Sequence, residues 1–213
     1  MKAIYALQDR SGDGTVTTTA LACRLAVTPA SASGMVRKLS DQGLVSHVRY
    51  RGVQLTEAGT KVALEVLRHH RLLELWLAET LGVPWDRVHD EAEVLEHVLS
   101  EDLEALIAAK LGHPTHDPHG DPIPTADLEL PEEPTQSLAE LEPGAIGTFV
   151  RVSDSDPEML RYLTERGIAP GDTLCVEDKQ PFGGPLFVRF RGEVHVLGGK
   201  LAGAMRVRLG GAA

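Results

Sequence analysis

The stretch 112–136 limits the fold most, because it carries six prolines: Pro114, Pro118, Pro122, Pro124, Pro131 and Pro134. Proline fixes φ and has no backbone N–H to donate, so neither a regular helix nor a central strand can run through this stretch. Before it, apolar residues recur mainly with helical spacing. After it, they come in short β-prone runs. We therefore predict an α+β chain in which an extended connector joins a helical part to a β part.

The β part contains five short β-prone runs, which Gly and Pro separate. They are AIGTFVRV (145–152), DTLCVED (172–178), LFVRF (186–190), EVHVL (193–197) and AMRVRL (204–209). One helix is expected near PEMLRYLTERG (157–167). Runs of this length and spacing are typical of a small barrel, here of about 70 residues.

Charge is unevenly distributed along the chain. Residues 1–71 hold ten Lys and Arg against five Asp and Glu, a net charge of +5, whereas the whole chain carries −10. The remainder is therefore at −15. A basic first third in an otherwise acidic chain is typical of a DNA-binding domain joined to domains of another kind.

Two short helices joined by a tight turn are predicted in this basic third. TTTALACRLA (17–26) is the first, with threonines available to cap it. Thr28 suits the N-cap of the second helix, Pro29 its first position, and Gly43 its end. Its apolar stripe consists of Ala32, Met35, Val36 and Leu39. A second helix that starts with small polar residues is typical of a helix-turn-helix.

The segment 44–59, LVSHVRYRGVQLTEAG, has two β-prone runs on either side of a basic tip, the pattern of a two-stranded wing. The start of a recognition helix enters a major groove about 12 Å wide, where small polar residues reach phosphates or base edges without clashing. Together these elements predict a DNA-binding winged helix. The expected DNA contacts are Thr28, Pro29, Ser31, Ser33, Arg37, Lys38, Arg49 and Arg51.

A long amphipathic helix is predicted over 56–80, opening with Thr56 and Glu57. Its apolar residues are too numerous for one side to bury against a small head: Val62, Leu64, Val66, Leu67, Leu72, Leu73, Leu75, Trp76 and Leu77. A second apolar surface implies a partner, most simply in a symmetric homodimer. A dimer also suits DNA, since two heads can engage half-sites one helical turn apart.

VHDEAEVLEHVLSEDLE (88–104) is predicted as one further amphipathic helix, which carries His89, Glu93, Glu96 and His97. Positions three and four apart share a helix face, so these side chains gather together. The long helix adds His70 and Glu74, again four apart. Such a face is either a solvated polar surface or a divalent-cation site. Imidazole with carboxylate and no thiolate suits Mn(II) or Fe(II), with Zn(II) or Co(II) as competitors.

Several other classes of protein fit poorly. No apolar run approaches the roughly 18 residues that span a membrane, and the N-terminus lacks a signal-peptide pattern. Two distant cysteines, Cys23 and Cys175, indicate neither a disulfide framework nor a thiolate zinc site, so a reduced cytoplasmic setting is expected. A metallohydrolase is an alternative, but no nucleophile or phosphate-loop motif accompanies the metal pattern.

The chain resembles the DtxR/MntR (diphtheria toxin repressor) family of metal-dependent transcriptional regulators over nearly all of its length. The resemblance rests on SGMVRKLSDQGLV, YRGVQLTEAG, RHHRLLE, VHDEAEVLEHVLSEDLE, HGDPIP and LTERGIAPGD. It implies a winged helix at 1–60, a helical metal-binding and dimerisation domain at 61–125, a linker at 126–138 and a barrel at 139–213. That barrel is similar to the SH3-like module of ferrous-transport accessory proteins.

The resemblance also implies two metal sites. Glu93, Glu96 and His97 match the primary, activating site, whereas His70, Glu74 and His89 match the ancillary site. In three-domain members the barrel contributes to the ancillary site, and Asp156 is the expected ligand, with Glu158 as the alternative. His113, His116 and His119, in a proline-rich loop, are expected in water.

Two departures from the family pattern bear on the metal. Iron-sensing members often have a cysteine where this chain has Glu93, and an all-oxygen and imidazole set favours Mn(II). The family's first-helix ligands lie a few residues before the pair that matches Ile4 and Tyr5. Either the N-terminus is shortened, or Met1 or a water molecule completes the primary site.

We therefore predict a homodimeric, cytoplasmic repressor of metal-uptake genes, activated by Mn(II) or Fe(II), that binds a palindromic DNA operator and is not an enzyme. The alternative is a winged-helix repressor that senses a small organic ligand.

Overall fold

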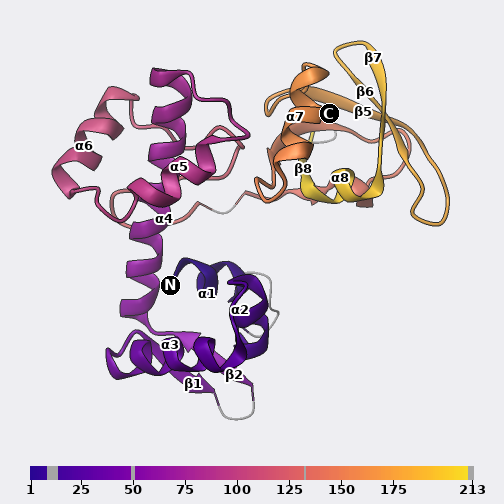
Figure 1. Ribbon diagram of the computed structural model, residues 1–213. Coiled ribbons are helices and arrows are strands. Elements are labelled where there is room, and N and C mark those ends of the chain that lie inside the picture. Colours follow the sequence, from indigo (N-terminus) through magenta and orange to yellow (C-terminus); the bar gives the residue numbers. More distant parts are fainter. Residues whose placement is uncertain (9–13, 49–50, 132, 211–213) are drawn as a thin grey trace. The chain divides into compact units, whose positions relative to one another are not determined.

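The computed structural model describes residues 1–8, 14–48, 51–131 and 133–210. They form two compact units, Met1–His69 with Pro124–Leu130, and His70–Ile123 with Pro131–Ala213. Figure 1 labels the helices and strands. In the part of the chain so described, no helix is long and apolar enough to cross a membrane.

The first unit contains the predicted winged helix. Helices α1 (Lys2–Gln8), α2 (Thr18–Arg24) and α3 (Pro29–Asp41) precede an antiparallel hairpin of β1 (Val45–Val48) and β2 (Gly52–Leu55). The hydroxyl of Thr28 caps α3 by accepting from the N–H of Ser31 at 3.1 Å, with Pro29 in the first turn. A small core holds these elements together: Ile4, Val16, Leu21, Val36, Val45, Val53, Leu55 and Ala63.

One residue of the predicted stripe on α3 was placed wrongly. Ala32 and Val36 are buried, four residues apart, but Met35 is 45% exposed. Helix α2 and the hairpin are small. They cover only a narrow stripe of α3, and the side of α3 next to that stripe stays exposed. Met35 therefore lies on the outer side of the recognition helix.

Helix α4 (Glu57–Leu81) begins as predicted, since the Thr56 hydroxyl accepts from the N–H of Gly59 at 3.1 Å. It continues from the first unit into the second. There Leu72, Leu73, Leu75 and Leu77 are buried against Val88, Ala92, Ile107 and Ile123 of the same chain. Much of the apolar surface that suggested a partner is therefore covered from within the chain.

The single helix predicted over 88–104 is wrong, because the chain makes two helices there. Helix α5 (Val88–Leu95) ends with Glu96 at its C-cap, and α6 (Glu101–Lys110) begins after Ser100. The Ser100 hydroxyl accepts from the N–H of Leu103 at 3.3 Å, and acidic residues fill the first turn of α6. A capped start with acidic residues is a stable way to begin a new helix. His97 consequently falls between helices.

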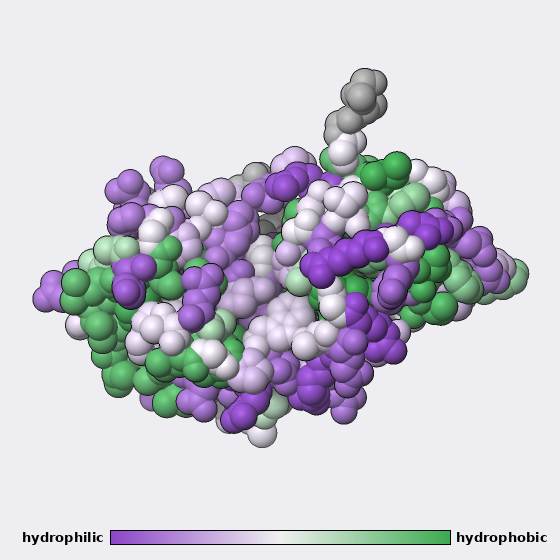
Figure 2. All heavy atoms as spheres, turned by 90° about the horizontal axis from the view of Figure 1, so that it is seen from above, coloured by the Kyte–Doolittle hydropathy of each residue, from purple (hydrophilic) through white to green (hydrophobic). Residues whose placement is uncertain are grey.

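The exposed apolar surface of the helical region lies on α5, on the turn between α5 and α6, on α6 and at the end of α4. Its members are Leu81, Val94, Val98, Leu103 and Leu106, of which Val98 is 78% exposed. Figure 2 shows hydrophobic atoms, in green, gathered over this region at the left. A surface of this kind on a soluble domain marks an interaction site.

The proline-rich connector has no regular helix or strand among its described residues between α6 and β3, as predicted. It is nevertheless well packed. The backbone N–H of Val152 donates to the carbonyl of His119 at 3.0 Å, and Arg71 of α4 pairs with Asp121 at 3.2 Å. Gly120 (φ +85°) lies so close to β4 that an added Cβ would be 1.8 Å from the carbonyl oxygen of Val150.

The C-terminal part is an antiparallel sheet with strand order β3-β8-β4-β5-β6-β7. Its elements are β3 (Gln136–Ser137), the 3-10 turn η1 (Leu138–Glu140), β4 (Ile146–Val152), α7 (Pro157–Glu165), β5 (Thr173–Lys179), β6 (Leu186–Phe190), β7 (Glu193–Leu197), α8 (Gly199–Ala204) and β8 (Met205–Leu209). Phe149, Leu163, Val188 and Phe190 are among the residues of its apolar core. The α+β fold with a small SH3-like β-domain is confirmed.

We predict that Gly120→Ala lowers the free energy of unfolding by about 2–4 kcal/mol, because Ala meets both a positive φ and a backbone oxygen. Chemical unfolding followed by circular dichroism measures the change. Gly144→Ala is the matched control, since Gly144 has φ +90° but nothing within 4 Å of the added Cβ. Equal losses in the two variants would mean that the contact with β4 is unimportant.

Candidate metal centre and DNA-binding surface

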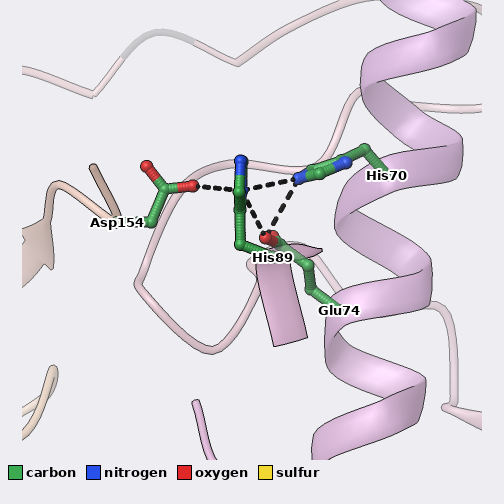
Figure 3. A group of neighbouring side chains, drawn as sticks. All are labelled: His70, Glu74, His89 and Asp154. Atoms are coloured by element: carbon green, nitrogen blue, oxygen red, sulfur yellow. Dashed lines mark hydrogen bonds and ion pairs between the residues drawn. The ribbon is translucent and has the colours of Figure 1, made fainter. Parts of the chain in front are cut away.

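Four side chains from three segments of the second unit come together, and one of them is the buried carboxylate of Glu74 (Figure 3). His70 and Glu74 project from α4 one turn apart, His89 comes from the first turn of α5, and Asp154 follows β4. His70 Nε2 lies 3.0 Å from Glu74 Oε1, and His89 Nδ1 lies 3.3 Å from the same oxygen. His89 Nδ1 is 2.8 Å from Asp154 Oδ2. This group can hold a cation.

The carboxylates and imidazoles of this group stabilise one another's charged forms. Burial alone would raise the pKa of Glu74, but hydrogen bonds from His70 and His89 outweigh it and hold that pKa below its usual range. Burial would likewise raise the pKa of Asp154, yet the hydrogen bond with His89 lowers it. Hydrogen bonds to Asp154 and then to Glu74 raise the pKa of His89 to about 10. A protonated His89 thus takes the place of a cation between two carboxylates.

A second group forms on the other side of the His70 ring. His70 Nδ1 lies 2.5 Å from Glu96 Oε2 and 3.8 Å from Glu93 Oε2. Glu96 is buried and Glu93 is half exposed. His97, expected beside them, has a side chain that is 67% exposed, with Nε2 3.9 Å from Glu96 Oε1. The break before α6 explains this, because His97 lies past the last turn of α5.

The β-domain contributes Asp154 to the first group, two residues before the expected Asp156. Asp156 has other partners, since it accepts from the backbone N–H of Glu158 at 3.2 Å and pairs with Lys200 at 2.8 Å. It caps α7, and its pKa is lowered mainly by the hydrogen bond from Lys200. Asp154 was not among the expected ligands. Which residue after β4 contacts His89 depends on tertiary packing, which the sequence does not record.

A third group, also missed, contains His119 and Asp117 on the far side of Glu74. His119 is fully buried, contrary to the expectation that it lies in water. It stacks on Trp85, and its Nε2 lies 2.8 Å from the Trp85 carbonyl oxygen. A carbonyl oxygen can only accept, so Nε2 carries a hydrogen, and in the neutral ring Nδ1 has the lone pair. That Nδ1 has no hydrogen-bond partner and lies 3.9 Å from Glu74 Oε2 and 4.0 Å from Asp117 Oδ1.

The predicted DNA contacts gather on the exposed side of α3 and on the wing. Thr28, Pro29, Ser31, Ser33, Arg37, Lys38 and Arg51 are all exposed. Arg49 lies outside the described residues. Thr28 and Ser31 also bond each other through their hydroxyls at 2.9 Å, and Ser33 donates to the carbonyl of Pro29. This places a polar and basic surface on one side of the first unit.

Three family models cover most of the chain. Residues 1–53 match the N-terminal DNA binding domain of iron dependent repressors, residues 56–125 match their metal binding and dimerisation domain, and residues 136–209 match the FeoA domain. The iron-dependent repressor IdeR of Mycobacterium tuberculosis is 34% identical over 180 residues, which are 79% of this chain and 78% of IdeR. The chain belongs to the iron-dependent repressor family.

Other relatives agree with this family. The diphtheria toxin repressor of Corynebacterium efficiens is 30% identical over 97% of this chain and 92% of its own length. Among solved structures, a manganese-dependent transcriptional repressor in complex with manganese is 45% identical, with a TM-score of 0.90 over 97% of this chain and 96% of that one. This repressor is thus a metal-dependent DNA-binding regulator, and its family is not one of enzymes.

The side chains of this repressor fit a divalent cation. All members of the three groups offer imidazole nitrogen or carboxylate oxygen, the donors that Mn(II), Fe(II) and Zn(II) share. Buried carboxylates such as Glu74 and Asp117 are costly unless a positive charge or hydrogen bonds compensate them. Burial raises the pKa of Asp117 well above its usual value, and the nearby Asp121 and Glu74 raise it further. A cation between Glu74 and Asp117 would add positive charge to that of Arg71, whose Nε lies 3.7 Å from Asp117 Oδ2.

We predict that cation affinity rises steeply with pH. The pKa of His89 is raised to about 10 in the metal-free protein, so below that pH a cation must displace a proton to use the nitrogen. Between pH 6.5 and 8.5 the association constant for Mn(II) at this group should increase about tenfold per pH unit. Calorimetric titration measures it. His89→Gln has no proton to displace and should flatten the dependence; an unchanged slope would contradict this role of His89.

Proposed function

We propose that this repressor is activated by Mn(II), with Fe(II) as the alternative, and binds a palindromic operator upstream of metal-uptake genes as a homodimer in the cytoplasm. The observation that carries the proposal is the clustering of His70, Glu74, His89 and Asp154, whose ligand atoms all lie within 4.8 Å of one another. These residues come from the dimerisation helices and from the β-domain of a chain whose first unit is a winged helix. Zn(II) and Co(II) are possible substitutes.

The preference for Mn(II) rests on the chemistry of the donors. Glu93 supplies a carboxylate where iron-sensing members often have a thiolate, and hard oxygen donors favour Mn(II) over softer ions. A solved relative that is 45% identical is named manganese-dependent, which agrees, whereas IdeR is named iron-dependent. The donors alone therefore favour manganese without excluding iron.

The proposed ligands form two sites. His70, Glu74, His89 and Asp154 form the ancillary site, in which we now place Asp154 in the role first given to Asp156. Glu93, Glu96 and His97 form the primary site, which the exposed His97 side chain would complete by rotating toward Glu96 Oε1, now 3.9 Å away. His119 and Asp117 would extend the ancillary site from the other oxygen of Glu74. A bound cation would hold α4, α5 and the β-domain in one arrangement.

The DNA contacts would be of two types, to phosphates and to base edges. Arg37, Lys38, Arg49 and Arg51 would bind phosphates, whereas Thr28, Ser31 and Ser33, at the start of α3 beside Pro29, would reach base edges. The exposed apolar residues of α5 and α6 would form the contact between two copies. Two recognition helices related by a two-fold axis require an operator with matching symmetry.

The first experiment is the capture of genomic DNA fragments by the purified protein with Mn(II), with Fe(II) kept reduced, and with chelator. Enrichment of one palindrome near transporter genes only with metal would support the proposal and identify the cation. Equal capture in chelator would overturn metal activation.

We predict that Glu96→Ala abolishes Mn(II)-dependent operator binding while the circular dichroism spectrum stays unchanged. Glu96 is a buried carboxylate of the proposed primary site, and its loss removes a charged ligand. Glu91→Ala is the matched control, because Glu91 is exposed on the same helix. Gel-shift titrations with and without Mn(II) measure the effect; retained metal dependence in Glu96→Ala would remove this residue from the activating site.

We also predict that Arg37→Ala and Lys38→Ala weaken binding to all DNA sequences alike. Each should reduce the slope of log K against log salt concentration by about one, because each phosphate contact releases close to one counterion. Fluorescence anisotropy over a series of salt concentrations measures the slope. An unchanged slope would mean that the side chain does not contact phosphate.

A further inference from the structure

Gly34 lies in the interior of the recognition helix α3, where the fold does not require a glycine. Its backbone is helical and has no positive φ, so L-residues adopt this conformation readily. An added Cβ would have no neighbour within 4 Å among the described residues, so no packing contact needs the space either. Glycine inside a helix is less stable than alanine, because it loses more conformational freedom on folding. The contacts within the described first unit therefore give no reason for a glycine here.

Residue 34 faces away from the core of the first unit. Two residues along an α-helix turn by about 200°, so Gly34 lies opposite both Ala32 and Val36, which are buried. Arg37 and Lys38 follow it by three and four residues, share its side of the helix and are exposed. Gly34 thus lies on the outward side of α3, beside two of the proposed phosphate contacts.

The polar side chains at the start of α3 are short and are bonded back to their own helix. The hydroxyls of Thr28 and Ser31 lie 2.9 Å apart, and that of Thr28 also accepts from the N–H of Ser31. The hydroxyl of Ser33 donates to the carbonyl of Pro29 at 2.8 Å. Side chains held in this way extend little beyond the backbone. They can reach base edges only if the backbone of α3 itself comes close to the bases.

We propose that Gly34 is a specificity-determining residue of this repressor, because the absence of a side chain lets the backbone of α3 come close to the base edges in the major groove. Close approach of backbone to a ligand is a common use of glycine. Each base pair presents a different set of groups in that groove, so a backbone in contact with one pair excludes pairs whose groups do not fit. This inference rests on the proposed function, because α3 must enter the groove.

The test is the selection of DNA from a library of duplexes of random sequence, by the full chain with Mn(II), for the wild-type protein and for Gly34→Ala. The wild-type protein should select one palindrome. Gly34→Ala should bind that palindrome roughly 5- to 150-fold more weakly, the usual effect of one mismatched base pair, because its methyl group keeps the helix away from the bases. The sequences that Gly34→Ala selects should differ from the palindrome at adjacent base pairs in each half-site and agree elsewhere.

Two further measurements separate this role from damage to the fold. Affinity for unrelated DNA should not change, because phosphate contacts such as those of Arg37 and Lys38 supply nearly all of non-specific binding. The folding equilibrium constant of the first unit should rise roughly 2- to 5-fold in Gly34→Ala, since alanine has fewer unfolded conformations to lose. Hydrogen exchange of the α3 amides measures this rise. Weaker operator binding by a more stable protein does not come from a damaged fold.

Gly203→Ala is the matched control, because Gly203 is also exposed in a helix, α8, and its added Cβ has no neighbour within 4 Å in the described part of the chain. It lies in the β-domain and should leave DNA binding unchanged. Equal affinity of Gly34→Ala and the wild-type protein for the palindrome would overturn the proposal, and so would an equal loss on all sequences. A wild-type protein that selects no common sequence would instead overturn the proposed function.

Discussion

A buried carboxylate, that of Glu74, is the constraint around which the second unit is organised. Only 1% of its side chain is exposed, and an isolated charge in such a place is strongly unfavourable. The compensating groups come from two helices: His70 from α4 itself and His89 from α5. Asp154, after β4, is held in turn through His89. One of the contacts between the β-domain and the helices therefore belongs to the same cluster as the proposed metal chemistry.

Sequence reasoning predicted those parts that depend on local spacing. The pair His70 and Glu74 shares a face because four residues make about one helical turn, whatever the surroundings. The caps Thr28 and Thr56 were predictable for the same reason, since a hydroxyl there bonds an N–H only three residues on. The winged helix and the β-domain followed from such local patterns, read in order.

Prediction and structure differ where contacts between distant segments decide. Asp154 rather than Asp156 reaches His89 because of how the chain leaves β4, and no local pattern records this. His119 is buried by its stacking on Trp85, far away in sequence. The break between α5 and α6 did have a local signal, a serine followed by acidic residues at Ser100–Asp102. It was overlooked because the helical spacing of apolar residues continues across 88–104.

The exposed valines in α5 and in the turn that follows it have a consequence for how the repressor responds to its own abundance. Helix α5 has eight residues, and helices that short are marginal unless packing supports them. Val94 lies in its last turn and Val98 three residues past its end, close in sequence to Glu93 and Glu96, so a second copy that covers the valines would also steady the two carboxylates. Mass action then links self-association to ligand binding. Diluting the protein should raise the metal concentration needed for half-occupancy, which makes the set point of the regulator a function of its expression level.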